Sequence, residues 1–557
     1  MGSPVPPRTI LQSTHQPVND FEIVAGGHSG RTGGIPFIQL FSMQSGRAFI
    51  RYIPPGLLTI SLMIVFVTTL APGLTWANGG SDGGDLIAAA ARGGIAHPTG
   101  YPLYLLLARL FQFLPLGSLA FRTNLMSALV TALAAALVYS IVTAFLSTSR
   151  PVQYWPAGMA AGMAFGLAPL IWSQAVITEV YALQAFLVVL ILYLYAFAKP
   201  VQASESEQSR LSRWRGLVLG LAMGNHVTSI LLVPVALLLG SVHSQPEPDG
   251  TPHAGRSWFR SLKFDAASLR KQLACFVLGL SLYLIIPLRA LTHPPVNWGN
   301  AVTPERLWWL VSGQLYQSYY LQFTLAGLWE RIQAWAGLLL EQFGLPGLVL
   351  GSIGLVVFGS RSRLYALTAW MAAVSLAFAV FYRSDDSYVY LIPMFISFAI
   401  WIGLGSAGLV KGLSARLPIL GLGLGLLLIG YFLGRSVVYV SEVDASDDLR
   451  AESFGREVLA AAPENALIFA KGDRAVFTLW YYHFALSERP DLAVMASDLL
   501  HFDWYQENLQ STYPSLAVPG PFPWPGTIAA ANPSRPACYV QYADQTEIEC
   551  AGRMTTP

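Results

Sequence analysis

Two carboxylates and a histidine follow the first long apolar run of the chain at short intervals. Asp82 and Asp85 stand in the sequence Ser-Asp-Gly-Gly-Asp, and His97 begins the sequence His-Pro-Thr-Gly-Tyr-Pro. Ionisable groups at a membrane are costly to keep there and therefore indicate a functional site. A carboxylate can take a proton from an attacking hydroxyl, and a cationic side chain can hold a departing phosphate. The stretch predicts transfer chemistry, with Asp82 as the base and Asp85 as the alternate.

Each of these residues also has a purely structural interpretation. An aspartate followed three residues later by an acid is typical of a helix start closed by a capping box. The sequence that begins at His97 reads equally well as a rigid turn that carries an exposed imidazole. A cap and a base are compatible, because one carboxylate can serve both purposes, and the glycines between the two acids let a ligand approach.

Other polar residues inside or beside apolar runs are candidates for contacts with a substrate or with a donor phosphate. An unpaired carboxylate in such a place needs a cation, a metal or a substrate. An arginine there either holds a phosphate or extends from a helix end to the membrane surface, and a buried Asn or His often only joins two helices. Besides His97, the candidates are Tyr101, Arg122, Glu179, Asn225, His226, Arg289, Asn297 and Asp385.

The sequence contains no spacing typical of a metal site, a Walker loop, a dinucleotide-binding glycine motif or a nucleophile elbow. We therefore expect no required cofactor, although the clustered acids leave a divalent metal possible.

The composition predicts a protein with many membrane spans. The chain has 557 residues, of which 54% are hydrophobic and only 11% are charged. The apolar residues fall into blocks of about 18 to 27, which is the length of a membrane-spanning helix. The formal net charge is +2, and the Lys and Arg residues lie in short patches between apolar blocks. Nucleic acid is therefore not an expected partner.

The apolar blocks and the basic patches predict about eleven spans and their orientation. Residues 1–53 have the composition of a disordered cytoplasmic tail, and a start of translation at Met43 would instead leave a short basic leader. Residues 86–92 and 101–114 are expected to form short helices at the outer surface. The expected single spans lie at 54–71, 119–146, 154–171, 175–198, 272–290, 333–358, 364–381, 388–407 and 417–438.

The block from Trp214 to Gly240 decides the orientation of everything that follows. One continuous helix would put several basic loops outside, against the positive-inside tendency. Two short helices that meet at Gly224-Asn225-His226 restore it, and they bring the loop 291–332 and Asp385 to the outer face. Each half is too short for a full span, so this hairpin would need shielding by other parts of the protein. The hairpin is the preferred interpretation.

The residues after 440 are expected to form a small α/β domain outside the cytoplasm, so that the domains are 1–53, 54–440 and 441–557. Helices are predicted over 448–462, 473–486 and 503–509, and strands over 466–471 and 492–496. Cys538 and Cys550 both lie in this polar segment. They would form a disulfide if the segment is extracytoplasmic.

Several motifs resemble a known family. The chain looks like the GT-C superfamily of membrane glycosyltransferases, and within it the protein O-mannosyltransferase-like family long catalogued as of unknown function. The similarity covers about residues 50 to 510, and its specific part is the acidic loop with the sequence from His97. The motifs are Leu70-Ala71-Pro72, Asp82-Gly-Gly-Asp85-Leu86, Gly94 to Tyr104, Arg122-Thr-Asn124-Leu125, Trp172 to Tyr181, Gly224 to Thr228, Pro287 to Ala290, Asn297-Trp298-Gly299, Gly472-Asp473, Leu479-Trp480-Tyr481 and Arg489-Pro490-Asp491.

The resemblance implies an inverting transfer of a hexose, mannose-like, from a polyprenyl phosphate to an acceptor hydroxyl on a protein or glycan. It implies a catalytic acid in the first outer loop, which Asp82 matches, whereas the family usually has Glu where this chain has Asp85. His97 matches a basic residue that holds the donor phosphate in related enzymes. The expected place is an integral membrane position, the plasma membrane in a prokaryote, with the active site outside.

Two other classes of function compete with this interpretation. A transporter or lipid flippase would also have a broken helix such as the one expected at Asn225-His226, but its acids would lie near the middle of the bilayer. A structural membrane protein without activity would leave Asp82, His97 and Glu179 unexplained.

Overall fold

The computed structural model describes residues 43–146, 154–196, 204–244, 262–321, 324–357, 362–414 and 418–551. Most of the predicted tail therefore lies outside the described residues. The first helix, α1 (Met43–Thr68), begins before the predicted span at residue 54, and Pro54 and Pro55 lie inside it. Residues 47–557 form one unit by their mutual contacts, and every feature discussed below belongs to it.

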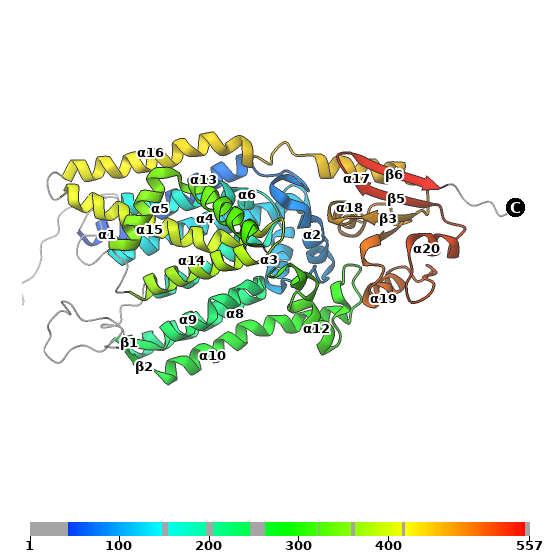
Figure 1. The fold of residues 1–557 in the computed structure, drawn as a ribbon, viewed down its shortest axis with the longest axis horizontal. Coiled ribbons are helices and arrows are strands. Elements are labelled where there is room, and N and C mark those ends of the chain that lie inside the picture. Colours follow the sequence, from blue (N-terminus) through cyan, green and yellow to red (C-terminus); the bar gives the residue numbers. More distant parts are fainter. Residues whose placement is uncertain are drawn as a thin grey trace, which may run out of the picture. The chain divides into compact units, whose positions relative to one another are not determined.

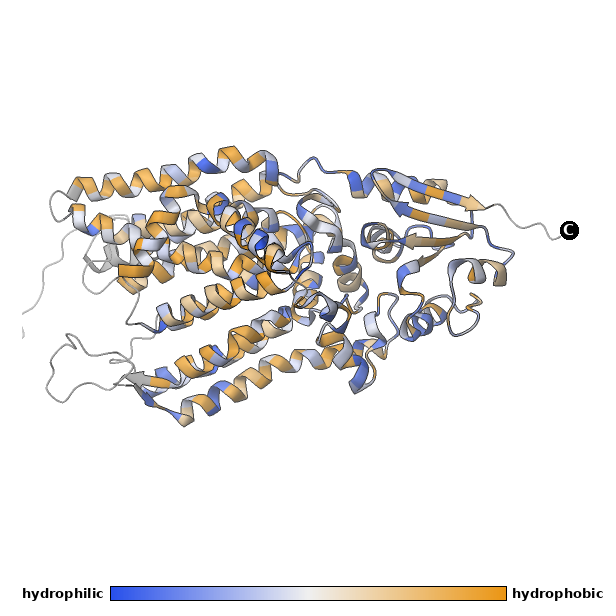
Figure 2. Ribbon diagram, in the orientation of Figure 1, coloured by the Kyte–Doolittle hydropathy of each residue, from blue (hydrophilic) through white to orange (hydrophobic). Residues whose placement is uncertain are grey.

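Long helices dominate the chain between α1 and residue 443, and Figure 1 shows many of them lying side by side. They are α4 (Leu119–Leu146), α7 (Val180–Ala196), α8 (Glu205–Asn225), α10 (Ala266–Leu280) with α11 (Ile285–Ala290), α13 (Leu325–Val357), α14 (Arg363–Phe381), α15 (Ile392–Ser414) and α16 (Pro418–Val443). Figure 2 shows how apolar these helices are. Their apolar surfaces fit a lipid environment.

Among the described residues, six helices are long and apolar enough to cross a membrane. A seventh span results if α5 (Trp155–Gly166) and α6 (Pro169–Ala175), which are bent by 67° to one another, count as one. The finding supports a membrane protein with many spans, whereas the number eleven stays a prediction. The other expected spans are shorter helices or, as in α8, carry several charged residues.

The break at Asn225-His226 is present, and the chain doubles back there. Helix α8 ends at Asn225, a 3₁₀ turn follows over Val227–Leu231, and α9 covers Val233–Gly240. Ser268, at the start of α10, binds both arms: its hydroxyl lies 2.6 Å from that of Ser212 in α8 and donates to the carbonyl of Gly240 at 3.1 Å. The two arms therefore start and end at the same level, as in the expected hairpin. Strands β1 (Val242–Ser244) and β2 (Leu262–Phe264) connect it to α10.

Two short helices follow α1 in the segment that carries the two acids and His97. Helix α2 (Gly83–Arg92) ends at Gly93, which has a φ of 64°, a conformation that glycine adopts without strain at a helix C-terminus. Helix α3 (Pro102–Gln112) begins with proline in its first turn, where the missing N–H is not needed. The segment 93–101 between them carries His97. It is fixed by a β-bridge between Ile95 and Asn297, which precedes helix α12 (Pro304–Val311).

The residues after 445 contain a four-stranded sheet with the strand order β4-β3-β5-β6. Strands β3 (Leu467–Lys471), β4 (Ala493–Ala496) and β5 (Ala537–Tyr542) are parallel, and β6 (Thr546–Ala551) pairs antiparallel with β5. The helices are α17 (Arg450–Ala461), α18 (Asp473–Trp480), continued by a π-helical turn to Ala485, α19 (Asp503–Thr512) and α20 (Pro525–Ala531). Each of the five elements predicted from the sequence here has a counterpart in this arrangement.

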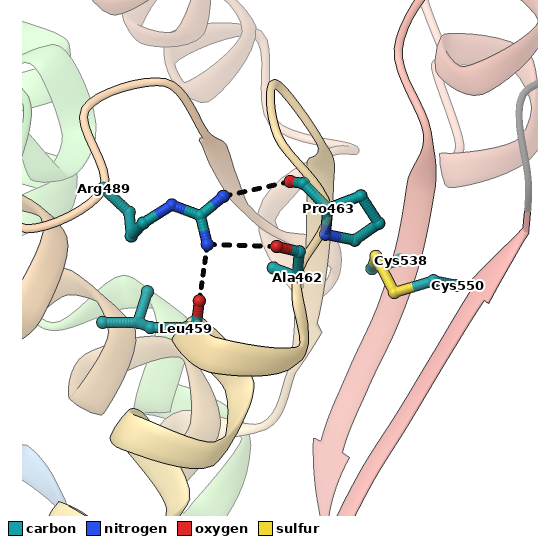
Figure 3. The surroundings of a disulfide bond; sticks show 6 residues. All are labelled: Leu459, Ala462, Pro463, Arg489, Cys538 and Cys550. Carbon is teal, nitrogen blue, oxygen red and sulfur yellow. Dashed lines mark hydrogen bonds between the residues drawn. A yellow bond between two sulfur atoms is a disulfide. The ribbon is translucent and has the colours of Figure 1, made fainter.

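A disulfide and an arginine stabilise this segment (Figure 3). Cys538 and Cys550 face each other across β5 and β6 and are bonded to one another. Arg489 donates to the carbonyl oxygens of Leu459, Ala462 and Pro463. These carbonyls lie at and just beyond the C-terminal end of α17, where intrahelical partners are missing. The disulfide that the sequence left open is thus formed in the structure.

Candidate functional site

Asp85 lies on the first turn of α2 and is completely buried, with a side-chain exposure of 0%. One of its carboxylate oxygens accepts hydrogen bonds from the backbone N–H of His97 at 2.9 Å and lies 2.7 Å from Nδ1 of the same residue. The other oxygen accepts a hydrogen bond from the indole of Trp298 at 3.0 Å. Both carboxylate oxygens of Asp85 thus take part in hydrogen bonds with His97 or Trp298, and these bonds hold the two residues in place.

Asp82 is the more accessible of the two acids. It directly precedes α2 but makes no capping hydrogen bond with its side chain, so the cap expected from the sequence is absent. Its carboxylate lies 3.4 Å from Nε2 of His97, and 34% of the side chain is exposed. The imidazole of His97 therefore lies between the two acids, with one ring nitrogen toward each.

The surroundings of Asp82 make its carboxyl a weaker acid than usual. Burial raises the pKa of Asp82, the positive charge of His97 counteracts this, and the nearby carboxylates of Asp473, Asp85 and Asp386 raise it further, to about 6. A base with a pKa slightly below neutrality is ionised at pH 7 and still takes up a proton readily.

The pKa of His97 is raised, whereas the pKa of an ordinary buried histidine is lowered. Burial alone would lower its pKa, but the carboxylate of Asp82 and the hydrogen bond with Asp85 raise the pKa of His97 to about 9. The imidazole is therefore a cation at neutral pH, with a hydrogen on each nitrogen.

Aromatic rings surround this cluster on the side of the helices. Tyr101 lies 5.1 Å from the His97 ring and 5.8 Å from His226, and His226 lies 5.7 Å from Tyr181 and 5.9 Å from Tyr390. Beyond His226, a narrow, mostly apolar cavity of about 40 Å³ lies between α7, α14 and the start of α15. The candidate residues Tyr101 and His226 thus connect the acids to an apolar cavity.

Glu179 lies in the turn before α7 and is buried. Burial raises the pKa of Glu179 well above its ordinary value, and the negative charge of Asp82 adds to the shift. Burial and the charge of Asp82 thus favour the neutral form of this carboxyl, and in that form it can donate a hydrogen bond.

Two candidate asparagines shape the site through other parts of the protein. Asn225 donates to the carbonyl of Val180 at 3.2 Å and to the side chain of Gln184 at 3.1 Å. Asn297 donates to Asn300 at 3.1 Å, next to the bridge with Ile95. Both side chains thus join neighbouring segments of the protein, as is common for a buried asparagine.

The structure does not bring Arg122, Arg289 or Asp385 to the acids. Arg122 donates to the carbonyls of Gln112, Leu116 and Gly117 and so closes the turn after α3. Arg289 lies at the other end of α2, beside Gly93. Asp385 is exposed, and its neighbour Asp386 is the residue whose charge acts on Asp82.

Three further residues of the site were not proposed as site residues: Trp298 and Asp473, which lie in resembling motifs, and Asp386, which belongs to the same acidic turn as the candidate Asp385. Asp386 accepts from the Tyr181 hydroxyl at 3.4 Å, and Asp473 begins α18. Asp473 lies in one of the resembling motifs, Gly472-Asp473, and this was the available signal. Within the part of the chain that the structure describes, no three His, Cys, Asp or Glu side chains form a metal site, so a divalent metal has no evident ligand set there.

Asp448 connects the loop before the acids to the C-terminal segment. One of its oxygens accepts from the Thr75 hydroxyl at 2.6 Å and from the N–H groups of Trp76 at 2.9 Å and Ala77 at 2.7 Å. Burial alone would raise the pKa of Asp448, but the hydrogen bonds from Arg450, Thr75 and Trp76 lower it to about 2. The loop that leads to Asp82 is therefore fixed by a carboxylate that stays ionised.

The arrangement of the helices matches a solved glycosyltransferase of the GT-C type. The structure of ArnT from Cupriavidus metallidurans bound to undecaprenyl phosphate aligns over 88% of this chain and 93% of ArnT, with a TM-score of 0.57 and 12% sequence identity. The likeness shows that the chain has a polytopic membrane fold of the GT-C type.

The sequence comparisons point to one family within that class. Residues 82–248 match the N-terminal domain of protein O-mannosyl-transferase TMEM260, and residues 451–547 match the TMEM260-associated domain 2. The chain is 27% identical to protein O-mannosyl-transferase TMEM260 of Mus musculus and 23% identical to that of Dictyostelium discoideum, over 83% of its own length in both cases. It spans 65% and 59% of those two proteins. The resemblance to the O-mannosyltransferase-like family is thereby confirmed.

Proposed function

We propose that this chain is a glycosyltransferase that moves a mannose-like hexose from a polyprenyl phosphate to an acceptor hydroxyl outside the cytoplasm, with inversion at the sugar carbon. The names of its relatives, both protein O-mannosyl-transferases, support the sugar and a protein acceptor. The undecaprenyl phosphate bound to ArnT supports the class of donor.

The different environments of the two acids are the observation that carries the proposal. Asp85 is buried and binds His97 and Trp298, whereas Asp82 is partly exposed and has its pKa raised to about 6. Two neighbouring carboxylates that differ in this way in exposure and hydrogen bonding have different roles, one as a base and one as a positioning residue. Asp82 is the base, and Asp85 positions His97.

The reaction then needs few groups. The acceptor oxygen attacks the anomeric carbon from the face opposite the phosphate, and its proton passes to the carboxylate of Asp82. The bond between the anomeric carbon and the phosphate oxygen breaks, and the phosphate leaves with the electron pair. The imidazolium of His97 lies beside Asp82 and stabilises negative charge on the phosphate as it departs. One bond forms and one breaks, and because the attack comes from the face opposite the leaving phosphate, this single displacement inverts the sugar carbon.

The apolar cavity beyond His226 is the proposed contact for the prenyl carbon nearest the phosphate, because a volume of about 40 Å³ holds no more than one or two such groups. Its walls are mostly apolar, and the rings of Tyr181, Tyr390 and His226 stand at its polar end. A donor placed there would have its phosphate and sugar toward His97 and Asp82. The neutral carboxyl of Glu179 would donate to a sugar hydroxyl.

The position of the acids favours a transferase over a transporter. Asp82 and Asp85 lie at the start of α2, a ten-residue helix outside the long apolar helices. A transporter that uses acids for coupling would place them within the spans, near the middle of the bilayer.

We expect Asp82→Asn to reduce transfer from a polyprenyl-phosphate hexose by at least a factor of about 100, because general base catalysis contributes roughly that much or more. The amide has the same shape, so donor binding and thermal stability should change little. The measurement is the transfer of radiolabelled hexose by the purified protein in detergent. Turnover equal to that of the unchanged protein would rule out Asp82 as the base.

A further inference from the structure

A second cavity, of about 230 Å³, lies at the far end of α2 and contains three arginines. Arg92 comes from the last turn of α2, Arg109 from the last turn of α3, and Arg289 from the end of α11. No acidic side chain is among the described residues that line it. The cavity therefore carries a local excess of positive charge.

Two of the three guanidinium groups are available to a ligand. Arg92 donates to the carbonyl of Phe484 and to the hydroxyl of Ser487. Arg109 lies over the ring of Phe113 at 4.8 Å, and Arg289 lies against Gly93. Among residues with a described position, neither Arg109 nor Arg289 pairs with a carboxylate or donates a side-chain hydrogen bond. A phosphate would supply the acceptors that these two side chains lack.

Glycines and apolar side chains form the rest of the cavity, and the exposed apolar side chains around it favour a lipid as its ligand. Leu105, Leu106, Ile285 and Ile286 line it. Around it, Leu106, Leu110, Leu284 and Leu288 are exposed, as side chains that face acyl chains are. Arg109 and Arg289 lie near the ends of their helices, where a long cationic side chain reaches the headgroup level of a membrane.

This cavity is separate from the proposed donor site. No residue lines both cavities. The segment 97–102 stands between them: the rings of His97 and Tyr101 pack toward His226 and the acids, while Gly100 and Pro102 line the arginine cavity. Asp82 and Arg92 lie ten residues apart along α2, which corresponds to about 15 Å. One hexosyl phosphate does not bridge the base and these arginines.

We infer that Arg92, Arg109 and Arg289 form a second lipid-binding site, which holds the phosphate of a membrane lipid whose chain lies against α3 and α11. The phosphate belongs either to a second polyprenyl phosphate or to an anionic phospholipid of the bilayer. The binding of a lipid phosphate by these arginines does not depend on the transferase assignment, whereas the description of this site as the second one rests on the proposed donor site.

The test is native mass spectrometry of the purified full chain with defined lipids: a short polyprenyl phosphate, phosphatidylglycerol and phosphatidylcholine. The unchanged protein should bind phosphatidylglycerol or a second polyprenyl phosphate, and R109Q/R289Q should weaken this binding at least tenfold. Arg92 is left in place because it also contacts Phe484. R109K/R289K, which keeps the charge, should bind with an intermediate affinity.

The matched control is Arg306→Gln, which removes an arginine of the outer loop that pairs with Glu507 and lies outside the cavity. It should bind lipid as the unchanged protein does. If two molecules of polyprenyl phosphate and no phosphatidylglycerol bind, the ligand is a second polyprenyl phosphate. If phosphatidylglycerol binds, the ligand is an anionic phospholipid of the bilayer. Equal binding by R109Q/R289Q and the unchanged protein, or equal affinity for phosphatidylcholine, would overturn the inference.

Discussion

His97 is the residue on which the chemistry of the site depends most, because it contacts both acids. The carboxylate of Asp85 fixes its ring, and the ring in turn acts on Asp82 at 3.4 Å. The same pair of contacts sets two protonation states, an ionised base and a cationic imidazole, which the proposed transfer needs together. The pH dependence of the reaction should report both.

We expect the rate of transfer to rise with pH through about 6, where Asp82 loses its proton, and to fall through about 9, where His97 loses its charge. The measurement is kcat/KM between pH 4.5 and 10 in a buffer of constant ionic strength.

His97→Gln should move the rising limb to higher pH, because the cation that lowers the pKa of Asp82 is gone, and the falling limb should disappear. A profile that His97→Gln leaves unchanged would contradict the role of the imidazole.

At the scale of elements, the packing of α8 against α10 holds the hairpin. Gly216 and Gly220 of α8 allow this contact, since a Cβ at either position would collide with the backbone carbonyl of Gln272 or Phe276. Small residues of this kind let two membrane helices approach closely. The hairpin in turn places Asn225 and His226 beside α7 and the site.

We expect Gly216→Ala to destabilise the protein by roughly 1–3 kcal/mol, the usual cost of overpacking. The measurement is the midpoint of thermal unfolding in detergent. Gly434→Ala, in α16, is the matched control, because a Cβ there meets no atom within 4 Å and alanine favours a helix. An equal or higher midpoint for Gly216→Ala would show that the two helices do not pack as described.

At the scale of the whole molecule, the C-terminal segment takes part in the site. Asp448 holds the loop before the acids, and Asp473 of α18 raises the pKa of Asp82. The C-terminal segment therefore contributes contacts and charge to the candidate site, although the proposed base itself directly precedes α2.

We expect Asp473→Asn to move the rising limb of the pH profile to lower pH, because one of the negative charges that raise the pKa of Asp82 is removed. The maximal rate should change less than in Asp82→Asn. Asp447→Asn, an exposed acid of the same segment, should leave the limb in place. A shift to higher pH would refute the electrostatic connection.

The orientation of the molecule gives a second prediction at this scale. A cysteine at Glu464, introduced after Cys275→Ser, should react in intact cells with a maleimide that does not cross membranes. A cysteine at Lys411, in the last turn of α15, should react only after the cells are permeabilised, because this end of the helix is expected to face the cytoplasm. Protection at Glu464 would place the C-terminal segment and the site inside.

Sequence reasoning reached the local features and missed those that depend on distant contacts. The five C-terminal elements follow from apolar periodicity, which is a local signal, whereas the helix break at Asn225 is preferred because it keeps the later basic loops inside. The hydrogen bond that Asp85 accepts from Trp298 joins residues far apart in the chain, so the sequence did not reveal it. Asp385 and Asp386 are neighbours in one turn, and only the packing shows that Asp386 acts on Asp82.

The hairpin of α8 and α9 also bears on how the protein enters the membrane during synthesis. Helix α9 has eight residues and is about 12 Å long, too short to be retained in a bilayer by itself. Its carbonyl at Gly240 and the hydroxyl of Ser212 in α8 both meet Ser268, which is synthesised later. The contacts of Ser268 that hold the two arms of the hairpin together can therefore form only after α10 has been synthesised, so the hairpin and α10 depend on one another for their final arrangement.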